Sequence, residues 1–196
     1  MTANMRDVAR QLLFATLLGG LAGCRSAATV PPSPPPPSSV DDAALPAPWA
    51  AARLAPSAVP PVYLTVWRAA ENRSRCALLA PTRLTPAVAS QARARAASFG
   101  GGWGVAYDLP DERSAFGVAG TGARAWSGDV YDAWPERRVF ADGSRVGYGP
   151  EGGGAGPNWL AYVRVPGQDC LYNVWSRRGR AHLEELLAEL RFVSSE

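Results

Sequence analysis

A run of proline near the N-terminus constrains the chain more than any other feature. Positions 31–37 hold six prolines and one serine. Proline fixes φ and lacks an amide donor, so the run favours an extended polyproline II conformation and cannot lie inside a helix or a sheet. We therefore predict a disordered, proline-rich tether over residues 24–60. The remainder, 61–196, has the length of a single globular domain.

Residues 1–23 contain the three parts of an export signal. Arg6 and Arg10 precede an apolar run at 12–18, and small residues follow. The run is too short for a lasting transmembrane helix, which predicts a signal peptide. The last three residues of the leader and the residue after it are Leu21-Ala22-Gly23-Cys24. This tetrad resembles the lipobox of bacterial lipoproteins, in which a peptidase cuts before the cysteine.

The lipobox resemblance implies that Cys24 carries a thioether-linked diacylglycerol and that the new amino terminus is acylated. Each buried CH₂ contributes about 0.8 kcal/mol, so several acyl chains hold a protein firmly to a membrane. Arg25, rather than aspartate, follows the cysteine. By the sorting rule of many Gram-negative bacteria, this implies the outer membrane, facing the periplasm, rather than the inner membrane.

The tether would hold the domain tens of ångströms from the lipid surface, since extended proline-rich chain spans about 3.1 Å per residue. A spacer is what a lipid-anchored domain requires at this position. The alternative use of the run is as a docking motif for a proline-reading domain.

The pattern over 61–196 predicts an α+β fold, with a mainly antiparallel sheet and two helices, one early and one near the C-terminus. Thr85-Pro86 is expected to start a helix that runs to Ser98. Four leucines at i, i+3, i+4 and i+7 predict an amphipathic helix over 179–190. Hairpin signals such as Asp142-Gly143 make a layered α/β sandwich compatible with the pattern. The expected strands cover 62–67, 76–79, 103–107, 115–120, 138–140, 145–148, 159–165, 170–175 and 192–193.

Cys76 and Cys170 are the two cysteines besides Cys24. In an exported domain, two such cysteines are expected to form a disulfide. Both lie at the starts of expected strands, so they can face each other across the sheet. Neither belongs to a C-x-x-C pair, and a redox or nucleophilic cysteine is the alternative interpretation.

Charge and motifs argue against several classes of function. The chain has 20 basic residues, all arginine, against 17 acidic ones, and no concentrated basic stripe, so we expect no nucleic-acid partner. His182 is the single histidine and lacks companion ligands at metal-binding spacing, so it is expected at the surface or at a helix cap. The glycine-rich run 152–156 lacks the features of a phosphate-binding loop, and no cofactor is expected.

Two hypotheses for the function remain. The preferred one is a non-catalytic, lipid-anchored envelope module that binds a partner protein or an envelope polymer, or acts structurally. Four aromatic residues suggest a groove for a sugar or peptide: Trp126, Tyr131, Trp134 and Trp159. For each ring, packing in the core is the alternative interpretation. The second hypothesis is an envelope hydrolase that uses a pair of carboxylates. The candidates are Asp108, Asp111, Glu112, Asp129 and Asp132.

Overall fold

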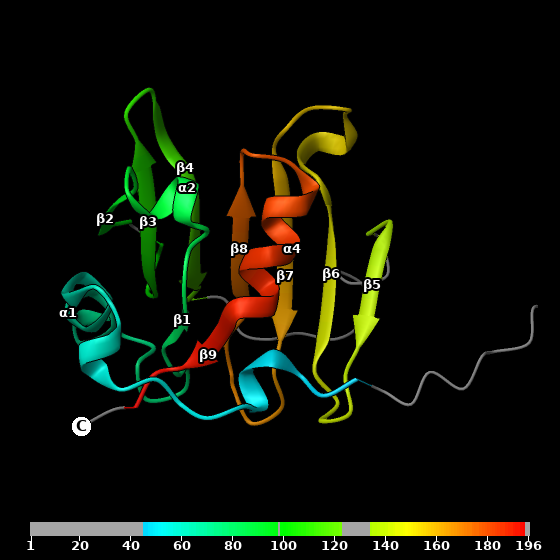
Figure 1. Ribbon diagram of the computed structural model, residues 1–196. Coiled ribbons are helices and arrows are strands. Elements are labelled where there is room, and N and C mark those ends of the chain that lie inside the picture. The colour runs from blue at the N-terminus through cyan, green and yellow to red at the C-terminus, as the bar shows by residue number, and fades with distance from the viewer. Residues whose placement is uncertain (1–44, 98, 123–133, 195–196) are drawn as a thin grey trace, which may run out of the picture. The chain divides into compact units, whose positions relative to one another are not determined.

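The computed structural model describes residues 45–97, 99–122 and 134–194. Within these ranges, the main sheet has seven strands in the order β2-β3-β4-β8-β7-β6-β5, and each neighbouring pair is antiparallel (Figure 1). Helices accompany the sheet, so the predicted α+β class with a mainly antiparallel sheet is confirmed. The signal peptide, Cys24 and the proline run lie outside the described residues.

Three hairpins form most of the main sheet, as the turn residues at 108–112, 142–143 and 166–169 predict. Gly143 and Gly167 each have a φ of 79°, in the left-handed region that favours a residue without Cβ. At the first of these turns, the Ser144 amide donates to the Asp142 carboxylate at 2.9 Å. The paired strands are β3 (Trp103–Leu109) with β4 (Glu112–Gly120), β5 (Glu136–Val139) with β6 (Arg145–Pro150), and β7 (Trp159–Arg164) with β8 (Tyr172–Ser176).

Helix α4 (Arg180–Glu189) packs against β7 and β8 (Figure 1). Its leucines at 183, 186 and 187 are buried, as the amphipathic pattern predicts. The chain then continues directly into β9 (Leu190–Phe192). This strand pairs with β1 (Leu79–Pro81) in a separate two-stranded antiparallel sheet. The predicted C-terminal helix and short final strand are therefore confirmed.

The segment predicted as the first strand, 62–67, is instead a helix. Helix α1 (Pro61–Ala69) begins with proline, whose preset φ suits the first helical turn. Tyr63 and Trp67 are four residues apart and so share one face of the helix. Tyr63 is fully buried beside Tyr107 of β3, and the Trp67 indole donates to the Cys76 carbonyl at 2.9 Å. The strand-like composition is overridden by these tertiary contacts.

The helix predicted from Thr85-Pro86 to Ser98 is also wrong, apart from its first turn. Helix α2 (Pro86–Ala89) is followed by β2 (Arg93–Ala96), which pairs with β3. The edge of β3 offers backbone partners to this segment, and such pairing outweighs a modest helix propensity. Ser98 lies outside the described residues. The strand expected at 76–79 lies slightly later, as β1.

The packed part of the chain begins before residue 61. The short helices η1 (Pro48–Ala50) and η2 (Pro56–Ala58) precede α1. Trp49 is only 2% exposed; its indole donates to Ser144 Oγ at 3.0 Å, and its ring meets Phe140 edge-on at 5.2 Å. Because this ring belongs to the core, the globular region starts upstream of the predicted boundary.

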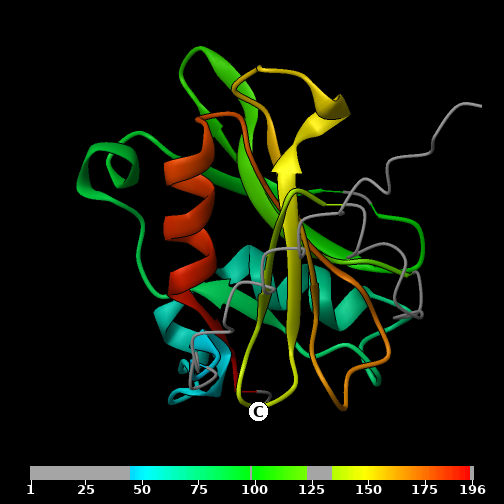
Figure 2. The ribbon, with the colours of Figure 1, turned by 90° about the vertical axis from the view of Figure 1, so that its right-hand side faces the viewer.

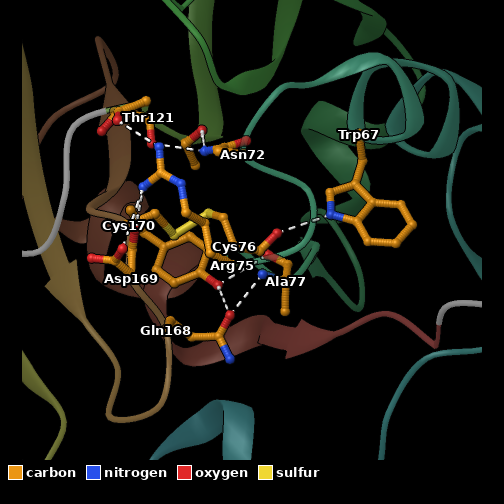
Figure 3. Close-up of a disulfide and its surroundings, with 12 residues drawn as sticks. Trp67, Asn72, Arg75, Cys76, Ala77, Thr121, Gln168, Asp169 and Cys170 are labelled. Carbon is orange, nitrogen blue, oxygen red and sulfur yellow. Dashed lines mark hydrogen bonds and ion pairs between the residues drawn. A yellow bond between two sulfur atoms is a disulfide. The ribbon is translucent and has the colours of Figure 1, made fainter.

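A disulfide joins Cys76, in the segment before β1, to Cys170, which precedes β8 (Figure 3). Both residues are buried, at 1% and 0% exposure. The Ala77 amide donates to Gln168 Oε1 at 2.7 Å, and the Tyr172 hydroxyl donates to the Ala77 carbonyl at 2.9 Å. The predicted pairing is confirmed. The burial of both sulfurs argues against the alternative of a reactive cysteine.

Candidate functional site

The main sheet has two faces with different surroundings. Side chains alternate along each strand, so Val163 and Val174 point to one face while Tyr162 and Trp175 point to the other. The first face is the core, where both valines are fully buried. Seen from the β5 edge, α4 lies on one side of the sheet (Figure 2). The face opposite α4 carries larger, partly exposed side chains, which makes it the candidate binding surface.

We call this surface the aromatic face. Its rings form two neighbouring pairs: Phe99 with Trp175, whose centroids are 5.8 Å apart, and Trp134 with Tyr162, at 5.6 Å. In the β7–β8 register, Leu160 lies opposite Trp175, and Tyr162 lies opposite Asn173. The aromatic face is defined by six partly exposed residues: Phe99, Trp134, Leu160, Tyr162, Asn173 and Trp175.

Glycines on the neighbouring strands allow these rings to lie close to the sheet. A Cβ on Gly117 of β4 would be 2.3 Å from the Trp175 ring, and one on Gly104 of β3 would be 2.5 Å from the Phe99 ring. Neither distance is possible for a real side chain. The rings therefore occupy space above the strands that ordinary residues would fill. The Trp175 ring is also fixed by its indole, which donates to the Ser114 carbonyl at 3.2 Å.

A cavity of about 300 Å³ lies at the Trp175 end of the aromatic face. Volumes of this order are at the lower end of those that hold small ligands. The apolar part of its lining comes from Phe99, Trp159, Leu160, Tyr162 and Trp175, and the polar part includes Ser114, Glu151, Asn158, Asn173, Ser176 and Arg177.

Asn173 is the most informative polar residue of this cavity. Its amide oxygen is buried and has no hydrogen-bond partner among the residues that the structure describes. Buried polar atoms are nearly always hydrogen-bonded, and an unpaired one costs free energy. Because this oxygen is buried, the Asn173 amide must rotate before the atom can accept a hydrogen bond from a ligand in the cavity.

Ser114, at the edge of the cavity, has a φ of 54°, which is unusual for a residue with a side chain. Asp108 and Arg95 hold it in place: its amide donates to the Asp108 carboxylate at 2.7 Å, and the Arg95 guanidinium donates to its hydroxyl. Arg95 also pairs with Asp108 at 2.8 Å. The hydrogen bond from Arg95 lowers the pKa of the Asp108 carboxyl, with the Ser114 amide adding to the effect. Asp108 is thus held as a carboxylate, whereas a general acid has to be protonated.

The residues predicted for an aromatic groove are only partly brought together. Trp134 belongs to the aromatic face. Trp159 also lines the cavity, although it lies on the opposite face of β7, where its ring is 6.4 Å from that of Tyr148 and 5.7 Å from the guanidinium of Arg180. The other two predicted rings, Trp126 and Tyr131, lie outside the described residues.

The predicted carboxylates are similarly divided. Asp111 and Glu112 lie at the turn between β3 and β4. Neither takes part in the hydrogen bonds that join Asp108 to Arg95 and Ser114. Asp129 and Asp132 lie outside the described residues. Among the candidates that the structure describes, Asp108 is held by Arg95 in a structural role.

His182 was expected at the surface or at a cap, but it is 9% exposed and lies in the core. Its Nδ1 is 2.9 Å from Ser176 Oγ, and its ring meets Phe116 edge-on at 4.9 Å. Burial lowers the pKa of this imidazole, with the charge of Arg178 contributing. Ser176 is itself 1% exposed and accepts a hydrogen bond from the Arg178 amide, so its hydroxyl oxygen contacts two polar partners, this amide and His182.

Four residues of the aromatic face were not predicted as site residues from the sequence: Phe99, Tyr162, Asn173 and Trp175. Period-two alternation over the expected strand 170–175 would have placed Asn173 and Trp175 on one face. Gly104 and Gly117, in strands otherwise rich in apolar residues, were the signal for close approach by a ring.

The fold and the site together define an α+β protein whose antiparallel sheet presents an aromatic, partly polar candidate binding face. No family model matches the sequence, and no curated protein or solved structure is similar to it. Within the described ranges, no group of three or more histidine, cysteine or acidic side chains is arranged to hold a metal ion. No helix in the same ranges is long and apolar enough to cross a bilayer.

Proposed function

We propose that this protein is a lipid-anchored component of the bacterial cell envelope that binds an envelope polysaccharide on its aromatic face. The anchor is supported by the leader and by the lipobox-like tetrad that ends at Cys24. The outer membrane, facing the periplasm, is the location that Arg25 favours.

The observation that carries the binding proposal is the cavity lined by partly exposed rings and by Asn173, whose buried amide oxygen has no hydrogen-bond partner among the described residues. A sugar presents apolar C–H faces, which pack on aromatic rings, and hydroxyl groups, which donate to an amide oxygen. Ligand sites commonly combine such an apolar lining with a few well-placed polar groups. For the hydrolase hypothesis, the lowered pKa of Asp108 beside Arg95 argues against this residue as the general acid of a carboxylate pair.

Binding is tested by calorimetry, in which the folded domain (residues 45–196, without the leader and tether) is titrated with polysaccharides extracted from bacterial envelopes. Tyr162→Ala and Asn173→Ala are each expected to weaken binding about tenfold, through a lost stacking surface and a lost acceptor. Trp67→Ala, which removes a half-buried ring of α1, serves as the control and should leave affinity unchanged.

Asn173→Ala also separates binding from folding. Its buried amide oxygen has no partner among the residues that the structure describes, so removing it should not lower the free energy of unfolding. Weaker binding with unchanged or greater stability supports the proposal. Failure of the wild-type domain to bind any of the envelope polysaccharides would overturn it.

The anchor is tested in cells by replacing the proposed lipidated residue. Cys24→Ser should move the protein from the membrane fraction to the soluble fraction and abolish incorporation of labelled palmitate. A Ser26→Ala variant, two residues away, should behave as wild type. A Cys24→Ser protein that remains in the membrane fraction would contradict the proposed anchor.

A further inference from the structure

Two arginines face each other across neighbouring strands of the main sheet. Arg145 of β6 and Arg164 of β7 are directly opposite in the register. Both side chains are exposed, and alternation places them on the same side of the sheet as Tyr162. Among the described residues, neither guanidinium forms an ion pair or a hydrogen bond.

Such an arrangement is unfavourable in the protein by itself. Directly opposite residues have their Cβ atoms only about 5 Å apart, and like charges in these positions destabilise a sheet. Guanidinium groups cannot lose their charge at physiological pH. An anion bound between them would relieve the repulsion, and arginine is well suited to bind carboxylates or phosphates through two parallel hydrogen bonds.

The arginine pair is continuous with the aromatic face. Arg164 follows Tyr162 by two residues on the same strand, which places the two about 7 Å apart along β7. Arg145 precedes by two residues Gly147, the residue that lies opposite Tyr162. A single elongated ligand can therefore contact the rings at one end and the two guanidinium groups at the other.

We infer that the polysaccharide bound by this protein is acidic, and that its carboxylate or phosphate groups bind between Arg145 and Arg164. This inference rests on the proposed function and names the chemistry of the ligand. A polymer is favoured over a membrane surface because the positive charges continue directly from a cavity suited to sugar rings.

The experiment uses the acidic polysaccharide fraction of bacterial envelopes, separated by anion exchange, and the same wild-type domain. The fraction is compared with portions whose carboxyl groups have been reduced to alcohols or whose phosphate has been removed by hydrofluoric acid. The intact fraction should bind at least about tenfold more tightly than the portion that has lost the recognised acid, because exposed charged contacts contribute modestly but measurably. Affinity should fall with added salt, which screens exposed charges.

The variant Arg145→Gln/Arg164→Gln should bind the intact fraction as weakly as the wild type binds the neutralised one. The matched control is Arg68→Gln/Arg73→Gln, which removes two exposed charges at and after the end of α1, on the opposite side of the sheet, and should retain the preference. The double Gln variant at 145 and 164 should also have a melting temperature about 1–3 °C higher than wild type, because a like-charge contact is removed. A structural role for these arginines would lower the melting temperature.

The outcomes separate the two proposals. Equal binding of intact and neutralised polysaccharide would overturn the acidic ligand and leave the proposed function standing. No binding of either would overturn both. Equal binding of the wild-type domain to vesicles of phosphatidylglycerol, lost in the Arg145→Gln/Arg164→Gln variant, would replace the polysaccharide with a lipid surface.

Discussion

Gly117 determines much of the shape of the aromatic face, although it has no side chain. It pairs with Trp175 in the β4–β8 register, and the Trp175 ring occupies the space in which a Cβ would lie. The carbonyl of Val105 is close on the same side, 2.5 Å from that Cβ position. A larger residue would have to displace both a ring and a backbone atom.

Gly117→Ala is therefore expected to lower the free energy of unfolding by about 1–3 kcal/mol, the usual cost of overpacking a close contact. Chemical denaturation measures the change. Gly154→Ala is the control, because nothing lies within 4 Å of its Cβ position, and it should change stability by less than about 0.5 kcal/mol. An unchanged denaturation midpoint for Gly117→Ala would show that the ring moves away freely.

Helix α4 is attached to the sheet by charge as well as by its leucines. The Glu184 carboxylate accepts hydrogen bonds from the Tyr148 hydroxyl at 2.6 Å, from Arg180 at 3.1 Å and from Arg138 at 3.3 Å. The hydrogen bond from Tyr148 is the main cause of the lowered pKa of Glu184, and the two arginines add to it. The sequence analysis expected a helix here but no such attachment.

Glu184→Gln should lower the free energy of unfolding by about 1 kcal/mol at pH 7, because the side chain is partly exposed and the contribution of its charged hydrogen bonds is screened. The pKa is lower in the folded state than in the unfolded state. The stabilisation is therefore complete above the unfolded carboxyl pKa, near 4.3, and is lost as the pH falls through the folded value. Unfolding curves at pH 7 and pH 3.5 test this.

Glu185→Gln, on the exposed side of the same helix, should have little effect at either pH. A difference between wild type and Glu184→Gln that widened as the pH fell would have the wrong sign for this explanation.

At the level of elements, the sequence predicts the hairpins well and the first third of the domain poorly. Asp142-Gly143 and Pro166-Gly167 carry their turn geometry in a few local residues, so alternation on either side is sufficient. Helix α1 and strand β2 depend on distant partners instead. Tyr63 packs beside Tyr107, and Arg93–Ala96 pairs with the edge of β3. A local sequence pattern reveals neither contact.

The candidate site is predicted less well than the fold, for a related reason. Trp134 and Trp159 were both identified from composition, yet Trp159 packs on the other face of β7 and still lines the cavity, a combination that composition does not predict. Which face of a strand is covered depends on where the helix packs. The missing partner of Asn173 likewise depends on all of its neighbours at once.

At the scale of the whole molecule, the disulfide connects regions 94 residues apart in sequence. Closing a loop of this length reduces the entropy of the unfolded chain, which corresponds to about 4.7 kcal/mol by loop-closure arguments, with measured losses for native disulfides of about 2–5 kcal/mol.

The double variant Cys76→Ser/Cys170→Ser should accordingly lose about 4 kcal/mol of unfolding free energy, measured by urea denaturation. Wild-type protein unfolded in the presence of reductant should approach the same value. Because both cysteines are buried, reductant without denaturant should leave the native protein unchanged over short times. A variant as stable as the oxidised wild type would contradict this account of the bridge.

The position of the bridge also determines how the domain would respond to tension. If the proposed anchor and the proposed polymer both hold the protein, tension acts on it at two points. A force applied at Leu45 acts first on the hydrogen bond from the Ala141 amide to the Leu45 carbonyl. It then acts on the Trp49 ring, which packs against Phe140. The bridge passes the force from Cys76 to Cys170, so between the anchor and Tyr162 only the chain before Cys76 and the short stretch 162–170 can be drawn out, and Arg145 is bypassed.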